Sequence, residues 1–277
     1  MNKRRGVLIA AVAAVQLIAC EQPVDDCYNA AMTGPIDARA PAQQPEPITA
    51  PDTTLRLILN IPAYTVHVFE DDTETGSYRV AVGSARYPTR VGTFAITSIT
   101  WNPWWVPPPS DWARNEKKTP PGPNNPMGKV KINYGPAYYL HGTPDSLRLG
   151  RPLSHGCVRM QNADAVALAL YLQRATYAPI SEAEQTRLLS DWDNSRTINL
   201  PTPVFLEIHY DVVVVTDSLV VIYPDIYDKL DGTIARAVVQ ELAAAGVPAH
   251  EIDTAAVAEF AKEARRGGRV AVSKLRR

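Results

Sequence analysis

The sequence predicts a mainly β domain with a helix packed on it, and three observations support this fold class. From residue 55 onward, apolar residues recur in short runs that alternate with polar residues, which is typical of half-buried strands. One strong helix pattern follows most of these runs, from residue 162. The chain has 277 residues, of which 45% are hydrophobic and 21% are charged, so neither a disordered chain nor a wholly membrane-embedded one fits.

Residues 1–19 are predicted to be an export signal. Three basic residues at positions 3–5 precede an apolar stretch of about thirteen residues, whereas a bilayer span needs roughly 20. The stretch ends in Leu17-Ile18-Ala19-Cys20, which resembles the bacterial lipobox, whose cysteine is lipidated and becomes the mature N-terminus. We therefore expect a lipoprotein signal peptide and lipid attachment at Cys20, with an ordinary small-residue cleavage site as the alternative.

Residues 20–53 are predicted to form an extended tether. Five prolines between Tyr28 and Thr54 lie among Ala, Gln, Thr and Asp, and no apolar period is sustained. At about 3.1 Å per residue, a polyproline-like chain from Cys20 to Leu55 reaches roughly 100 Å. Such a tether suits work at some distance from a membrane. Cys27 lies in this stretch, and both an intermolecular bridge and a free thiol are open for it.

Residues 54–231 are predicted to form the main domain. Residues 55–60 and 64–69 are expected to be two strands around an Ile61-Pro62-Ala63 turn. Further strands are expected over residues 78–82, 92–98, 129–133, 137–140, 204–215 and 219–223.

Two helices are predicted within this domain. Asn162 is expected to cap the first, which has Asp164 in its first turn and then four apolar residues, Val166, Leu168, Leu170 and Leu172. Ser181 and Glu184 form a capping-box pattern for a short second helix.

Residues 232–277 are predicted to be a helical, basic C-terminal extension in two pieces, broken near residues 246–248. The last part, residues 262–277, has seven basic residues and one acid, Glu263. We interpret it as a solvated surface, with contact to an anionic wall or lipid as the alternative.

The net charge of −1 gives no general reason to bind nucleic acid, but the charge is unevenly distributed. Residues 84–159 carry ten basic and three acidic side chains, a net charge of +7, so the rest of the chain is −8. A solvated surface accounts for part of this. The sharper interpretation is that the basic segment binds an anionic small substrate.

Cys157 is the strongest candidate for chemistry. A lone cysteine is usually a small buried apolar residue. Cys157, however, follows Ser154-His155-Gly156, a predicted turn in which glycine can adopt backbone conformations that are closed to other residues. Successive backbone N–H groups in such a turn can converge on an anion. Arg151 and Arg159 add positive charge, which favours the reactive thiolate.

His141 is the candidate base. It follows Tyr138-Tyr139-Leu140 and therefore lies at the end of a predicted strand. It can reach Cys157 if the intervening loop folds back. A cysteine and a histidine are the minimum for acyl transfer through a thioester, with backbone N–H groups holding the oxyanion. Each histidine alone could equally be a buried hydrogen-bonding residue.

These residues also carry a family resemblance. His141-Gly142-Thr143, with Cys157 sixteen residues on in Ser154-His155-Gly156-Cys157-Val158-Arg159-Met160, resembles the active-site signature of the L,D-transpeptidase catalytic domain family. Further resemblances cover a strand entry at residues 88–94, a substrate-capping insertion at 102–108 and 120–128, and closing strands at 203–205 and 225–227. The resemblance extends over about residues 54–231.

The resemblance implies a β-sandwich of mixed sheets with a helix after the cysteine. It implies Cys157 as the nucleophile, His141 as the general base and the Gly142 carbonyl as the group that orients the imidazole. The turn made by Ser154, His155, Gly156 and Cys157 would supply the oxyanion hole. Arg159 would support the site or bind a substrate carboxylate.

The capping insertion is rich in tryptophan, and four of these side chains need a role. They are Trp101, Trp104, Trp105 and Trp112. We expect some to pack in the core and others to form a mobile lid, with Trp104 and Trp105 as candidate substrate-binding residues.

The implied substrate is a peptidoglycan tetrapeptide stem, which is anionic. Cys157 would attack the carbonyl of its third residue and expel the terminal D-alanine. An amine on another stem, or a lysine of a wall-anchored protein, would then resolve the thioester. Neither a metal nor another cofactor is needed, and no nucleic acid is expected as a partner. The N-terminal signals place the protein on the periplasmic side as a membrane-anchored lipoprotein, with the outer membrane favoured over the inner.

Three alternatives are open at the sequence level. The same thioester could be resolved by water, which makes an L,D-carboxypeptidase or an enzyme that releases wall-linked proteins. A zinc hydrolase could use His141, His155 and Cys157, although the His-x-Cys spacing is poor for a tetrahedral site. A non-catalytic wall-binding lipoprotein is the third, and the intact cysteine and histidine argue against it.

Overall fold

The computed structural model describes residues 55–216, 219–230, 233–265 and 270–272. The signal peptide, the tether, Cys20 and Cys27 lie outside the described residues. The expectations for them therefore stay predictions.

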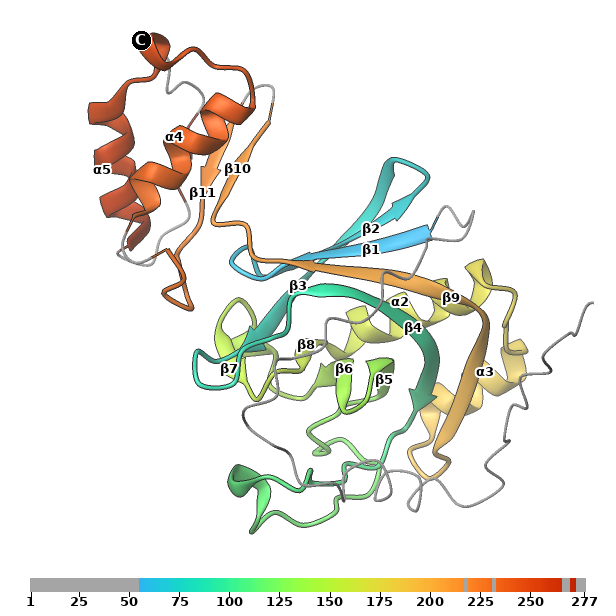
Figure 1. Cartoon of the computed structure of the whole chain (residues 1–277). Helices are drawn as coiled ribbons and strands as arrows, with labels where there is room; N and C mark the ends of the chain where they lie inside the picture. The colour runs from blue at the N-terminus through green and yellow to red at the C-terminus, as the bar shows by residue number, and fades with distance from the viewer. Residues whose placement is uncertain (1–54, 217–218, 231–232, 266–269, 273–277) are drawn as a thin grey trace, which may run out of the picture. The chain divides into compact units, whose positions relative to one another are not determined.

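The strands of the main domain form one nine-stranded sheet (Figure 1). In chain order they are β1 (Leu55–Asn60), β2 (Thr65–Glu70), β3 (Thr73–Gly83), β4 (Gly92–Trp101), β5 (Val130–Gly135), β6 (Tyr138–Thr143), β7 (Pro152–Ser154), β8 (Val158–Gln161) and β9 (Arg196–His209). Their order in the sheet is β2-β1-β9-β4-β5-β6-β8-β3-β7.

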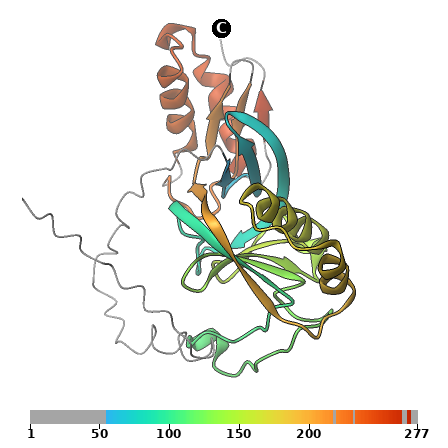
Figure 2. The same cartoon turned by 90° about the vertical axis from the view of Figure 1, so that its right-hand side faces the viewer.

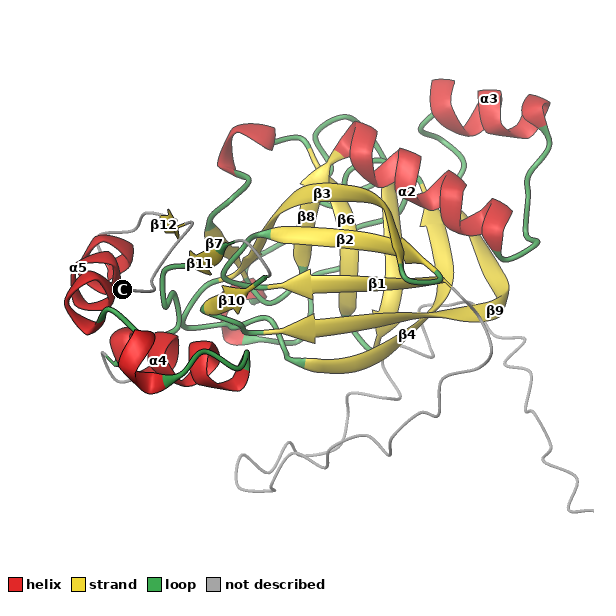
Figure 3. Ribbon diagram, turned by 90° about the horizontal axis from the view of Figure 1, so that it is seen from above, coloured by secondary structure: helices red, strands yellow, loops and turns green. Residues whose placement is uncertain are grey.

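The sheet closes on itself, because β2 pairs with both β1 and β3. The pairs β1–β9 and β6–β8 are parallel, whereas β4 pairs antiparallel with both β5 and β9. The sheet is therefore mixed and barrel-like (Figure 3). The prediction of a mainly β fold is confirmed at this level. The expected β-sandwich of mixed sheets is not confirmed, because the strands pair into one closed sheet.

The largest difference from the predicted strands concerns β9. It begins at Arg196 rather than at residue 204 and contains Pro201 and Pro203. Its register against β4 shifts between Ile96 and Ser98, and the two prolines lie in the stretch between the paired segments. Prolines are tolerated there because no ladder N–H is required. Beyond His209 the chain turns, so the single strand expected over residues 204–215 is two.

The helix α2 (Asn162–Ala175) begins where the pattern predicts, and it packs on β5, β6 and β8 (Figure 2). Leu168 and Leu172 are fully buried in the main core. The cap differs from the expectation: Gln161 is the N-cap, and the Asn162 Oδ1 instead accepts a hydrogen bond from the N–H of Lys129 at 3.0 Å. Asn162 therefore ties the helix to β5.

The second helix, α3 (Glu182–Ser190), has the predicted cap. The Ser181 side chain accepts a hydrogen bond from the N–H of Glu184 at 3.2 Å. This half of a capping box satisfies one of the amides that a helix leaves free at its N-terminus.

The remaining elements form a small module with its own core. Its strands, β10 (Val213–Val215), β11 (Val220–Ile222) and β12 (Val270–Val272), make an antiparallel sheet. The helices α4 (Ile234–Ala244) and α5 (Thr254–Arg265) contribute Val238, Leu242 and Val257 to the shared hydrophobic cluster. No helix within the described residues is long and apolar enough to cross a bilayer.

Candidate active site

Three polar side chains from neighbouring strands form one row. Lys131 of β5 is paired with His141 of β6, and His141 is paired with Arg159 of β8. Paired residues share a face of a sheet, and the alternate residues Ile132, Leu140 and Val158 are fully buried in the core. We call Lys131, His141, Arg159 and Cys157 the catalytic row, since Cys157 comes two positions before Arg159 and the charges of Lys131 and Arg159 act on its thiol.

His141 is held as a neutral imidazole. Its exposed fraction is 3%, and its Nδ1 lies 2.7 Å from the carbonyl oxygen of Gly142. Because a carbonyl only accepts, Nδ1 must carry the proton, which leaves Nε2 as an acceptor. Burial lowers the pKa of His141 to about 4, and the positive charges of Arg159 and Lys131 act in the same direction, against the raising effect of the Gly142 hydrogen bond.

Gly142 allows a close approach that any side chain would block. A Cβ at this position would lie 2.1 Å from the Asn162 Oδ1. That oxygen accepts from the N–H of Lys129, so it is fixed in place. The structure therefore places Gly142 where it was predicted, with its carbonyl on the imidazole of His141.

Cys157 is partly buried, and burial favours the protonated form of its thiol. Burial raises the pKa of Cys157, although a backbone hydrogen bond from Tyr139 and the charges of Arg159 and Lys131 oppose that effect. The basic neighbours thus act on the thiol as expected, and burial acts against them. The Sγ donates to the carbonyl of Ala137 at 3.6 Å, and among the described residues this carbonyl rather than His141 is its hydrogen-bond acceptor.

The turn before Cys157 is stabilised by Ser154. The Ser154 Oγ accepts from the N–H of Gly156 at 3.1 Å and donates to the carbonyl of Cys157 at 2.5 Å. Gly156 has a φ of 109°, a backbone conformation that favours glycine. The N–H of Gly156, which was predicted to bind the oxyanion, donates to Ser154 instead. Ser154 itself stabilises the turn through its hydroxyl.

His155 is exposed and lies in an aromatic stack. Its ring is 3.8 Å from that of Trp112 with an interplanar angle of 10°, and 4.7 Å from that of Tyr87. Burial, and then the charge of Arg159, lower the pKa of His155. Trp112, an aromatic residue of the insertion that was not among the predicted site residues, therefore contacts the turn through His155.

The predicted substrate-binding tryptophans lie elsewhere in the insertion. Trp104 is 44% exposed with the Lys118 Nζ over its ring at 5.0 Å, and Trp105 exchanges backbone hydrogen bonds with Thr119. Among the described contacts, neither joins Cys157 or His141. Trp101 belongs to the core, where its indole N–H donates to Gln173.

Two cations of the catalytic row are incompletely matched by the protein around them. The Arg159 Nε is buried without a hydrogen-bond partner. No carboxylate in the described part of the chain pairs with Lys131, whose Nζ lies 4.6 Å from the ring centroid of Tyr139. Burial lowers the pKa of both groups, and the charge of Cys157 opposes this. Such groups are suited to an anion that arrives with the substrate.

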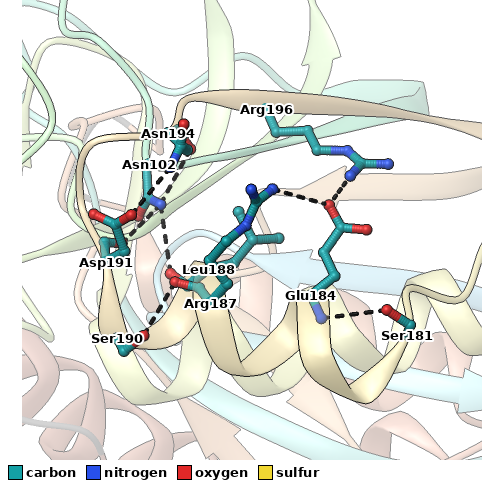
Figure 4. A network of polar contacts seen from close by, with 9 residues as sticks. All are labelled: Asn102, Ser181, Glu184, Arg187, Leu188, Ser190, Asp191, Asn194 and Arg196. Carbon is teal, nitrogen blue, oxygen red and sulfur yellow. Dashed lines mark hydrogen bonds and ion pairs between the residues drawn. The ribbon is translucent and has the colours of Figure 1, made fainter.

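A second group of buried polar residues holds the insertion. Asn102 donates from Nδ2 to the carbonyls of Leu188, Asp191 and Asn194, and thereby joins the end of β4 to α3 and the segment after it (Figure 4). Asn125 donates to the carbonyls of Pro103, Thr119 and Pro120. Lys129 donates to the carbonyl of Asp191 at 2.7 Å. We call Asn102, Asn125 and Lys129 the insertion anchor.

Within the described ranges, no group of three or more His, Cys, Asp or Glu side chains could hold a metal ion.

Comparison with known families supports the motif. The sequence model of the L,D-transpeptidase catalytic domain matches residues 55–200. This range contains the whole catalytic row and the insertion anchor.

Two named relatives and one solved structure illustrate the similarity. The chain is 28% identical over 130 residues to "Probable L,D-transpeptidase ErfK/SrfK" of Escherichia coli K12, covering 43% of this chain and 42% of that protein. Its identity to the Salmonella typhimurium protein of the same name is 26% over 170 residues, covering 58% and 55%. The chain thus spans about half the length of these relatives. A crystal structure of L,D-transpeptidase 3 from Mycobacterium tuberculosis with a faropenem-derived adduct is 20% identical with a TM-score of 0.35, covering 41% of this chain and 54% of that one.

Proposed function

Since the chain belongs to the L,D-transpeptidase catalytic domain family, we propose that it is a peptidoglycan L,D-transpeptidase that uses Cys157 as its nucleophile. The observation that carries this proposal is the state of His141. Its imidazole is neutral, its Nδ1 proton is held by Gly142, and it lies in the same row as Cys157. Cysteine acyl transfer needs a neutral base that can take the proton of the thiol, and His141, which is paired with Arg159 two positions after Cys157, is the candidate.

The first half-reaction forms a thioester. The His141 Nε2 takes the proton of the Cys157 thiol, and the sulfur bonds to the carbonyl carbon of the third residue of a tetrapeptide stem. The bond from that carbon to the nitrogen of D-alanine then breaks. The proton on His141 passes to this nitrogen, and D-alanine leaves as the free amino acid.

The backbone is suited to stabilise the intermediate. Because the N–H of Gly156 is engaged by Ser154, we assign the oxyanion to the N–H groups of His155 and Cys157. Their donation would act on charge that develops in the transition state. Lys131 and Arg159 would bind a stem carboxylate, and Trp104 and Trp105 are proposed to cover the stem from the insertion.

The second half-reaction consumes the thioester. An amine, from the side chain of a diamino acid on another stem or from a lysine of a wall-anchored protein, attacks the acyl carbon, and the sulfur leaves and regains its proton. The alternative is attack by water, which makes the enzyme an L,D-carboxypeptidase or releases wall-linked proteins. Thioesters favour amines over water, which supports transfer.

The proposed location follows from the first residues of the chain. A signal peptide over residues 1–19 would export the protein, and acyl chains on Cys20 would hold it at a membrane, with the outer membrane favoured. A tether over residues 20–53 would then let the domain reach the wall. Metabolic labelling with a fatty acid tests this step, and a label that survives Cys20→Ala would contradict it.

The nucleophile is tested by intact mass. The protein is incubated with a carbapenem or a stem tetrapeptide, and we expect a covalent adduct on the wild type and none on Cys157→Ala. Cys27→Ala is the matched control, because it removes a thiol outside the described domain and should keep the adduct. An equal adduct on Cys157→Ala would sink the proposal.

The acceptor is tested separately by product analysis. Muropeptides are incubated with the protein, with and without an added amine acceptor. Cross-linked or amine-capped products that depend on the acceptor indicate transfer. Tripeptides formed at the same rate in both arms indicate hydrolysis.

A further inference from the structure

We propose that Tyr227 is a positioning residue for the catalytic turn, which it reaches through Thr89. This inference rests on the proposed function. Tyr227 lies outside residues 55–200, the range matched by the family model. The structure thus assigns part of the catalytic apparatus to the segment that links β11 to α4.

The first step is a pair of hydrogen bonds to one hydroxyl. The Tyr227 OH donates to the carbonyl of Gly83 at 2.8 Å and accepts from the N–H of Thr89 at 3.1 Å. Burial raises the pKa of Tyr227, so the hydroxyl keeps its proton and can donate. Tyr227 therefore joins the two ends of the loop between β3 and β4.

The second step runs from that loop to the catalytic turn. The Thr89 Oγ1 accepts from the N–H of Gly83 at 2.8 Å and donates to the carbonyl of Gly156 at 3.0 Å, and both bonds are buried. The N–H of Ser84 donates to the carbonyl of Ser154 at 2.9 Å. The loop thus holds the turn at two of its carbonyls, directly before Cys157.

The third step fixes Tyr227 itself. Its N–H donates to the Tyr210 OH at 2.7 Å, and that hydroxyl donates to the carboxylate of Asp225 at 2.6 Å. The rings of Tyr210 and Tyr227 stack with centroids 5.2 Å apart. Both side chains pack against the main core, so the Tyr227 hydroxyl is held from behind.

This chain of contacts bears on the reaction because the Gly156–Cys157 peptide sets the direction of the sulfur and of the oxyanion amides. Small displacements of a reacting group lower a rate strongly, with losses of about 100-fold for a shift of about 1 Å. Removal of the Tyr227 hydroxyl should therefore slow acylation more than it weakens substrate binding.

The test compares Tyr227→Phe with Tyr171→Phe in the full-length protein. Tyr171 is a matched control, because its hydroxyl also has two partners, Glu70 and Thr75, which lie away from the catalytic turn. Carbapenem acylation followed by intact mass gives the maximal rate and the half-saturating concentration. We expect Tyr227→Phe to lower the maximal rate about ten-fold, with the half-saturating concentration within about two-fold, and Tyr171→Phe to match the wild type.

A second pair of variants tests the middle of the chain of contacts. Thr89→Ser keeps the hydroxyl and should acylate like the wild type, whereas Thr89→Val should resemble Tyr227→Phe. Wild-type rates in Tyr227→Phe, or equal losses in Thr89→Ser and Thr89→Val, would overturn the inference. Should Tyr227→Phe fold poorly, the Thr89 pair decides alone.

Iodoacetamide alkylation of Cys157 separates this inference from the proposed function. Its rate depends on the exposure and pKa of the thiol and needs no stem peptide. A wild type that is alkylated but never acylated contradicts the proposed function. In that case we still expect the alkylation rates of Tyr227→Phe and Thr89→Val to differ from the wild-type rate by more than about two-fold, and the rate of Tyr171→Phe to equal it. Equal alkylation rates in all of these proteins would overturn the role of Tyr227.

Discussion

Two groups of buried or partly buried polar residues lie in or next to strands of the closed sheet, and they differ in how their donors are matched. In the insertion anchor, Asn102 and Asn125 each donate to three carbonyls, and the Lys129 Nζ donates to Asp191. In the catalytic row, the donor Nε of Arg159 is buried without a hydrogen-bond partner, and the Lys131 Nζ lies over the ring of Tyr139. The anchor has an unmatched atom too, but it is an acceptor, the Asn102 Oδ1. Lys129 and Lys131 are only two residues apart.

The difference separates stability from function. A buried donor that is matched within the protein stabilises the fold, whereas an unmatched one lowers stability until something else supplies the acceptor. The anchor fixes the base of the insertion, and the row keeps its charges available. We therefore expect changes in the row to alter the reaction, and changes in the anchor to alter the free energy of unfolding.

The largest expected effect is the loss of the base. His141→Gln should lower the acylation rate by about 10²- to 10⁴-fold, because no other group in the row can take the thiol proton. The free energy of unfolding of His141→Gln near pH 7 should change much less than the activation free energy of acylation. Stopped-flow acylation and urea unfolding of the same variant check both halves, and a rate within about ten-fold of the wild type would remove His141 from the mechanism.

The next effect is the pH dependence that His141 imposes on the fold. Its folded-state pKa of about 4 is below its ordinary value of 6.5, so the unfolded chain binds more protons between these values. The contribution of His141 to the free energy of unfolding is fully present above about pH 6.5, and it falls by up to about 3 kcal/mol as the pH drops toward 4. Unfolding free energies measured from pH 7 to 4 should fall more steeply for the wild type than for His141→Gln. Parallel curves would mean that the imidazole is not held neutral.

The anchor is tested by Asn102→Ala. The change leaves three carbonyls without their donor and places alanine at a φ of 47°, so we expect a loss of about 2 kcal/mol in unfolding free energy. At a temperature where the variant is folded, acylation should stay near the wild-type rate. Full stability combined with a slow reaction would reverse the roles that we assign to the two groups.

The smallest effect compares the two lysines. The charge of Lys131 lowers the pKa of the Cys157 thiol against the raising effect of burial, so Lys131→Met should raise that pKa further and slow alkylation at neutral pH about ten-fold. Lys131→Arg should keep most of the effect, and Lys129→Met should lower stability without moving the alkylation profile. If the pH dependence of alkylation were unchanged in Lys131→Met, the charge of Lys131 would have no effect on the Cys157 thiol.

Much of the site could be predicted from local sequence. The motif from His141-Gly142 to Cys157 indicated the candidate nucleophile and base, and the family resemblance implied the Gly142 carbonyl that lies on the imidazole. The alternating runs predicted most strands of the main sheet. These features depend on neighbours in the chain or on periodicity. Residues 55–60 form a strand with the predicted bounds for this reason.

Other features depend on pairs that are distant in sequence. The burial of Cys157 reverses the shift in pKa that its basic neighbours suggested. Trp112 stacks on His155, whereas Trp104 and Trp105 were the expected contacts. Asn162 binds the N–H of Lys129 and Tyr227 reaches Thr89 across 138 positions. No local pattern marks any of these partners.

The sequence by itself determined the class of fold, the cysteine, its histidine and the glycine between them, because a motif and an alternation are properties of consecutive residues. Only the tertiary structure decided which amides remain for an oxyanion, which cations stay unmatched and which remote tyrosine holds the turn. Those outcomes depend on strand register and on burial. The hydrogen bonds that join residues 83, 89, 156 and 227 are examples, because they link parts of the chain that are distant in sequence.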